Sequence, residues 1–64
     1  MTLQNILNII SGDTPIKIIV DFKVIFAGCM SDTTKTNFNI IVGPYLSREV
    51  YRLNTMDGFI TIAC

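Results

Sequence analysis

The chain has 64 residues, with five Lys or Arg balanced by five Asp or Glu, no His and no Trp. This length predicts a single domain over residues 1–64. The absence of histidine excludes His-dependent triads and His-containing zinc sites, and a formal net charge of zero leaves no electrostatic footprint for nucleic acid.

Residues 2–11 predict a short amphipathic helix. Leu3, Ile6, Leu7 and Ile10 follow the i, i+3, i+4, i+7 spacing of one helix face. Thr2 is suited to cap the start of this helix, and we expect Gly12 in the left-handed position just past its end. So short a helix is unstable alone in water, so it must pack on another element.

Residues 16–30 predict strand structure. Every even position from Ile16 to Phe26 is apolar, which is the period-2 pattern of a strand. Because strands usually have about 5–6 residues, we favour a hairpin with strands over 16–20 and 24–30 and a turn at Asp21-Phe22-Lys23. One long strand bent at its centre is the alternative.

The segment from residue 31 to 48 predicts a polar surface loop over 31–37, a strand over 38–42 and one helical turn over 44–48, with Pro44 at its first position. The last part predicts strands over 49–53 and 59–63, paired as a hairpin. Asp57-Gly58 in the intervening turn is the usual choice where φ must be positive.

Together these elements predict an α+β fold. One N-terminal helix covers a small, curled sheet of four to five mostly antiparallel strands, or plugs the end of a small barrel. We expect no parallel crossover, because the connections between consecutive strands are shorter than the dozen or so residues that a crossover needs.

The apolar content of the chain is high for its size. Half of the residues are hydrophobic, although a domain this small buries only about 60% of the surface of its unfolded chain. We therefore expect a homo-oligomer, in which a second copy covers the surplus. No apolar run is long enough to span a membrane and no secretory signal is evident, so we expect a cytoplasmic protein with no membrane association.

No set of residues predicts catalysis. The serines lack a histidine base, Asp13, Asp32 and Asp57 stand in turn-like contexts, and the four glycines are scattered singly. Cys29 and Cys64 are expected to be reduced thiols that act as small hydrophobes. We therefore expect no enzyme activity, no cofactor and no metal site.

One cluster predicts binding. Tyr45, Arg48, Tyr51 and Arg52 bring aromatic and basic side chains together, as protein interfaces and nucleic-acid platforms both do. The balanced charge favours a protein partner and makes nucleic acid the lesser alternative.

The chain also resembles a known class of proteins. Its opening, Thr2-Leu3-Gln4-Asn5-Ile6-Leu7, and the run from Arg48-Glu49-Val50-Tyr51-Arg52-Leu53 into Asp57-Gly58-Phe59-Ile60-Thr61-Ile62 are similar to small uncharacterised proteins of Gram-positive bacterial phages and mobile elements. The resemblance implies a protein that binds a host protein in the bacterial cytoplasm, including inhibitors of defence systems such as anti-CRISPR proteins. A small nucleic-acid-binding barrel with a regulatory role and a structural assembly subunit remain alternatives.

Overall fold

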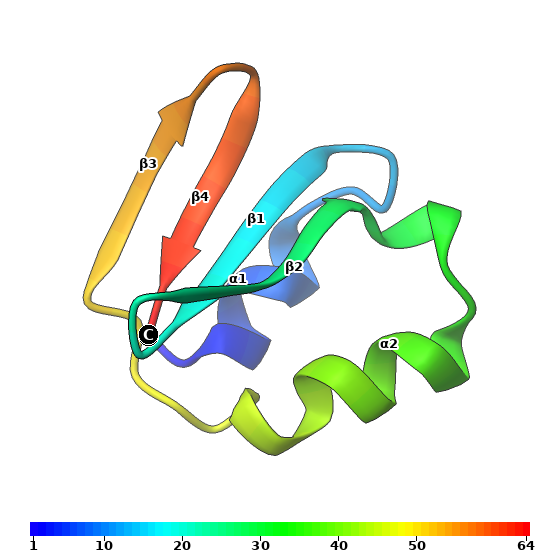
Figure 1. The fold of residues 1–64 in the computed structure, drawn as a ribbon, viewed down its shortest axis with the longest axis horizontal. Helices are drawn as coiled ribbons and strands as arrows, with labels where there is room; N and C mark the ends of the chain where they lie inside the picture. The colour runs from blue at the N-terminus through cyan, green and yellow to red at the C-terminus, as the bar shows by residue number, and fades with distance from the viewer.

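The computed structural model describes residues 1–64 as an α+β domain built on one four-stranded sheet (Figure 1). The strands lie in the order β2-β1-β4-β3, and the sheet is open at both edges, so the barrel alternative is wrong. The helices are α1 (Leu3–Ile9) and α2 (Lys35–Val42), and the strands are β1 (Pro15–Val20), β2 (Lys23–Cys29), β3 (Arg52–Met56) and β4 (Phe59–Ala63).

Helix α1 confirms the predicted N-terminal helix, with a shorter C-terminal end. The Thr2 hydroxyl accepts a hydrogen bond from the Asn5 N–H at 3.2 Å, and the Asn5 side chain accepts one from the Thr2 N–H at 3.1 Å. This capping box satisfies amides that the first turn leaves free. The prediction for Gly12 is wrong, because the chain leaves the helix at Ile10 in an extended conformation and needs no left-handed residue there.

Strands β1 and β2 confirm the predicted antiparallel hairpin. Its loop is a two-residue turn of Asp21 and Phe22, both with positive φ (52° and 68°). The register shifts between Ile18 and Ile19, so that β2 contains one extra residue at Ile25. Such a bulge bends its strand and increases the local twist.

Helix α2 replaces the strand predicted over 38–42 and the C-terminal part of the predicted loop. Thr34 caps it by accepting a hydrogen bond from the Asn37 N–H at 3.1 Å. Phe38 and Val42 stand four residues apart, which directs both toward the core on one helix face. The apolar run Phe38–Val42 is short, and such runs fit a buried strand or a helix equally well. A 3₁₀ turn over Gly43–Tyr45 follows, close to the predicted helical turn.

Strands β3 and β4 form the predicted hairpin around Asp57 and Gly58, but β3 begins three residues later than expected. The residues before it, Glu49 and Val50, instead lie against the N-terminus, where the Val50 N–H donates to the Met1 carbonyl at 2.8 Å.

The prediction of a mostly antiparallel sheet is confirmed, but the premise that the connections are too short for a parallel crossover is wrong. Strands β1 and β4 pair in parallel at the centre of the sheet, although the other two pairings are antiparallel. The chain between these two strands contains β2, α2 and β3 (Figure 1), which is ample length for a crossover. Short local connections do not limit pairing between strands far apart in sequence.

The two faces of the sheet differ. Helices α1 and α2 contribute to one hydrophobic core with Ile16, Ile18 and Ile62, and the Phe38 ring meets Phe26 edge-on at 5.1 Å. The opposite side, which we call the open face, has no helix over it. Register assigns ten side chains to this open face: Lys17, Ile19, Val24, Ala27, Arg52, Asn54, Met56, Phe59, Thr61 and Ala63.

Candidate functional site

The four predicted interface residues lie along one connected stretch of surface, but they differ in exposure and in the face they occupy. Tyr45 packs against the core, and the Arg48 guanidinium lies over its ring at 5.9 Å from the centroid. Tyr51 is 64% exposed at the end of the sheet, and Arg52 is exposed on the open face. Tyr45 therefore supports Arg48 from the core side, while Arg48 and Tyr51 belong to a common pocket.

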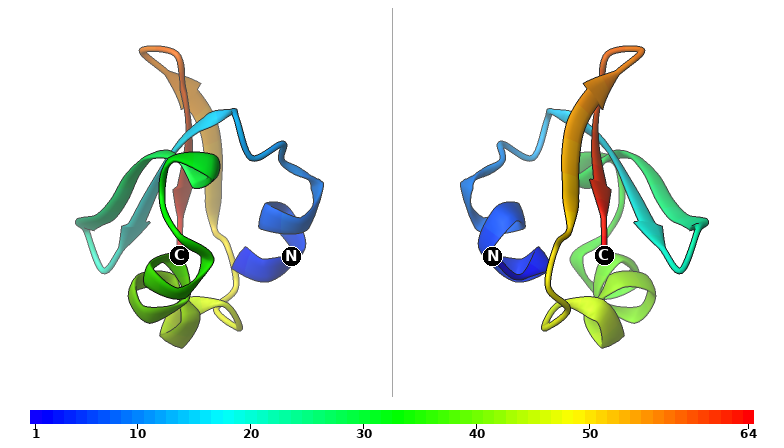
Figure 2. Two further views of the ribbon diagram at one scale, coloured as in Figure 1. Left: turned by 90° about the vertical axis from the view of Figure 1, so that its right-hand side faces the viewer. Right: turned by 90° about the vertical axis from the view of Figure 1, so that its left-hand side faces the viewer.

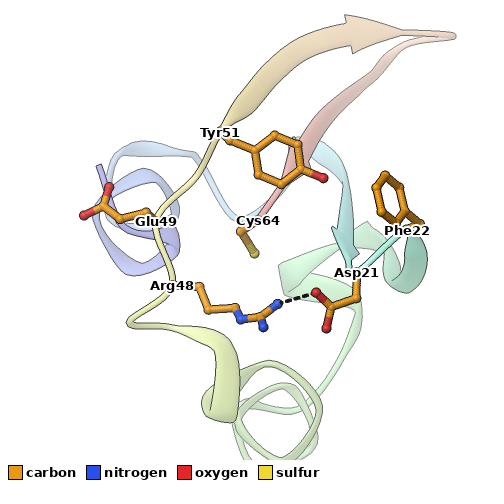
Figure 3. A pocket seen from close by; sticks show the side chains of 6 residues that line it. All are labelled: Asp21, Phe22, Arg48, Glu49, Tyr51 and Cys64. Carbon is orange, nitrogen blue, oxygen red and sulfur yellow. Dashed lines mark hydrogen bonds and ion pairs between the residues drawn. The ribbon is translucent and has the colours of Figure 1, made fainter.

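This aromatic pocket, as we call it, lies at the C-terminal end of β4 and has a volume of about 470 Å³. Figure 3 shows Tyr51 and Phe22 on opposite sides of the pocket, the Cys64 side chain below Tyr51, and Arg48 reaching across to Asp21. It has six lining residues: Asp21, Phe22, Arg48, Glu49, Tyr51 and Cys64. Two exposed aromatic rings beside an arginine are the side chains that protein interfaces favour.

Phe22 is the least expected residue of the pocket. Its side chain is 93% exposed and its φ is +68°, a conformation that glycine, asparagine and aspartate tolerate and phenylalanine resists. A two-residue turn with positive φ at both positions prefers Asn-Gly. Neither the core nor the turn therefore accounts for a phenylalanine here.

An ion pair closes one side of the pocket. The Arg48 Nη1 donates to the Asp21 Oδ1 at 3.1 Å and joins the β1–β2 turn to the segment before β3. The hydrogen bond to this carboxylate and its charge raise the pKa of Arg48 above its ordinary value. The guanidinium therefore contacts the Tyr45 ring and the Asp21 carboxylate, which together restrict its orientation.

The surroundings of both cysteine thiols favour the protonated form over the nucleophilic thiolate. Burial raises the pKa of the Cys64 thiol, although Arg48 acts in the opposite direction. Partial burial and the nearby carboxylates of Asp32 and Asp13 raise the pKa of Cys29. Both thiols are free, and a raised pKa keeps each one in its unreactive protonated form near neutral pH. No group of three or more His, Cys, Asp or Glu side chains is arranged to hold a metal ion.

Comparisons with known proteins found no match. No protein-family model matches the sequence, and no curated protein or solved structure is significantly similar to it. Neither α1 nor α2 has the length and apolar character that a membrane-spanning helix needs.

The open face is a second surface of interest. A hollow of about 250 Å³ joins it to the aromatic pocket, with Phe22 and Tyr51 shared between the two. The Lys17 ammonium lies over the Phe59 ring, 5.2 Å from its centroid. None of the four strands contains Asp or Glu, so the charged side chains of the sheet are all cations.

Of the pocket residues, the sequence predicts Arg48 and Tyr51 but not Phe22 or Asp21. A signal for Phe22 was present, because an aromatic residue in a predicted two- or three-residue turn has no core to enter. The pairing of Asp21 with Arg48 spans 27 residues of sequence and depends on how the β1–β2 turn meets the loop before β3.

Proposed function

We propose that this chain is a non-enzymatic binding protein whose aromatic pocket docks on another protein. The observation that carries the proposal is Phe22, an almost fully exposed aromatic side chain held at φ +68°. A left-handed conformation costs a non-glycine residue roughly 1–2 kcal/mol. A side chain that destabilises its turn and buries nothing is best explained by a contact with a second molecule.

Tyr51 and Arg48 complete the proposed anchor. Tyr51 faces Phe22 across the pocket (Figure 3), and Arg48 is already ordered by Asp21. Interface hot spots are enriched in tyrosine and arginine, and a few such residues provide most of the binding free energy. By the resemblance to phage and mobile-element proteins, the partner is a protein of the bacterial cytoplasm, and inhibition of a host defence system is the role we favour.

The test is Phe22→Asn, because asparagine tolerates positive φ. We expect this variant to unfold at an equal or higher urea concentration than the wild type, because it relieves strain in the turn. We also expect it to lose the partner, since removal of a hot-spot side chain costs about 2 kcal/mol or more, a roughly 30-fold loss of affinity.

The measurement starts from tagged wild-type chain immobilised in a bacterial lysate, with retained proteins identified by mass spectrometry and their affinities then measured by calorimetry. Ile40→Asn is the matched control, because Ile40 is an exposed apolar residue of α2 outside the pocket. A partner that binds Phe22→Asn as tightly as it binds the wild type would contradict the proposal. So would the absence of any specific partner.

The open face favours one second candidate, binding of single-stranded nucleic acid. Lys17 over Phe59, with Arg52 on the same face and no carboxylate in any strand, provides cations beside an aromatic ring. Such faces stack bases and contact phosphates.

This candidate predicts that a fluorescent oligonucleotide binds at about 20 mM salt and is released as salt rises. Lys17→Glu and Arg52→Glu should each weaken that binding at least tenfold, whereas Phe22→Asn should weaken it far less. Anisotropy titrations measure these affinities, and an oligonucleotide that fails to bind at low salt eliminates the candidate.

A further inference from the structure

The two edges of the sheet are protected to different degrees. At one edge, β2 contains the bulge at Ile25, a glycine at φ +129° (Gly28) and Lys23. At the other, β3 is exposed at every residue, has an unbroken register with β4 and contains no proline. Natural proteins usually protect edge strands with bulges, prolines or charges, because a free edge pairs readily with another strand. The β3 edge has only the charge of Arg52 at its start.

The N-terminal residues cover this side of the molecule only up to Val50, just before β3 begins. Met1 accepts a hydrogen bond from the Val50 N–H at 2.8 Å, and Arg48 accepts one from the Leu3 N–H at 2.9 Å. Beyond Val50 no segment of the chain lies on the outer side of β3, which is the last strand in the sheet order. The turn end of the β3–β4 hairpin projects away from both helices (Figure 2), and every residue of β3 is exposed, so its edge is open to approach from solvent.

We propose that β3 is the dimer interface of this protein, where it pairs antiparallel with β3 of a second copy to form a continuous eight-stranded sheet. A two-fold axis perpendicular to the sheet reverses the strand and keeps each face on its own side, so β3 is complementary to itself. The exposed aliphatic side chains of this strand, Leu53 (53%) and Met56 (58%), are then covered by the second copy.

Charge favours a second copy as the occupant. Arg52 begins β3, and Asp57 follows its last residue. With the axis at Asn54, Arg52 lies opposite Met56 of the second copy and beside its Asp57, and the same contact occurs twice. Opposite charges at neighbouring cross-strand positions are favourable, whereas a parallel pairing would put each Arg52 beside the other.

The test is to measure self-association of the full chain by sedimentation equilibrium. We expect a reversible dimer, and we expect Thr55→Lys to raise its dissociation constant at least tenfold, because it puts a charge on the edge of each copy. Thr36→Lys on α2 is the matched control, an exposed Thr→Lys change away from the edge, and should leave the constant unchanged. Circular dichroism melts establish that each variant is folded.

Arg52→Glu provides an independent variant, because it places a carboxylate beside Asp57 of the second copy. It should weaken the dimer at least tenfold. In the wild type, amide hydrogen exchange at residues 52–56 should slow as protein concentration rises. A wild-type chain that stays monomeric at all concentrations, or edge variants that dimerise like the wild type, would overturn the proposal.

The dimer edge shares no residue with the aromatic pocket, so the two proposals fail independently. Phe22→Asn should lose the protein partner and keep the dimer. Thr55→Lys should abolish dimerisation and leave the aromatic pocket unchanged.

Discussion

Ile6→Asp is expected to leave the chain unfolded at 25 °C. Ile6 is 3% exposed in α1 and packs into the single core that both helices and the sheet share. An unpaired carboxylate in such a position costs about 3–5 kcal/mol. A small domain has roughly 0.1 kcal/mol of stability per residue, so this loss approaches the whole free energy of unfolding. Loss of the far-ultraviolet circular dichroism of the folded state, and of its urea transition, measures the effect.

Ile9→Asp is the matched control for this prediction. Ile9 belongs to the same helix and is 75% exposed, so the identical change adds a charge that water solvates. Its cost should stay within about 1 kcal/mol, mainly from a negative charge near the C-terminus of the helix. Equal urea midpoints for the two variants would show that α1 does not pack as described.

Gly58→Val has the second largest expected effect. Gly58 holds φ +82° in the turn between β3 and β4, after Asp57 at φ +54°. No atom lies near the position that a Cβ would take, so the penalty is backbone strain rather than a clash. The left-handed conformation costs roughly 1–2 kcal/mol for a residue with a Cβ, and a β-branched residue resists it most. Urea denaturation should show this loss, with faster amide exchange in β3 and β4.

Gly43→Ala separates conformation from the simple loss of a glycine. Gly43 has φ −49° and ψ −44°, an ordinary helical conformation, and a Cβ there also meets open space. The alanine variant should be neutral or up to about 1 kcal/mol more stable, because it reduces the entropy of the unfolded chain. A Gly58→Val chain as stable as Gly43→Ala would contradict the positive φ at the turn.

The candidate site was predictable only in part. Arg48 and Tyr51 stand out in the sequence because basic and aromatic residues cluster there. The sequence does not show that Tyr45 of this cluster packs on the core, or that Arg52 faces the open side of the sheet. The pocket is made by Asp21 and Phe22, which come from a turn more than twenty residues earlier. Only folding brings that turn to the loop before β3.

The local pattern of residues determined the elements whose signals are local. The Thr2 cap and the apolar spacing after it define α1, and alternation with a two-residue turn defines each hairpin. Tertiary packing decided the secondary structure of Lys35–Val42. Its short apolar run suits a strand or a helix equally well, and the helix is the form that packs Phe38 against Phe26. The parallel pairing of β1 with β4 was also decided there. Hydrogen bonds between strands whose paired residues, such as Ile16 and Ile60, are far apart in sequence leave no trace in local periodicity. Burial of Ile16, Ile18 and Ile62 in one core is what brings those strands together.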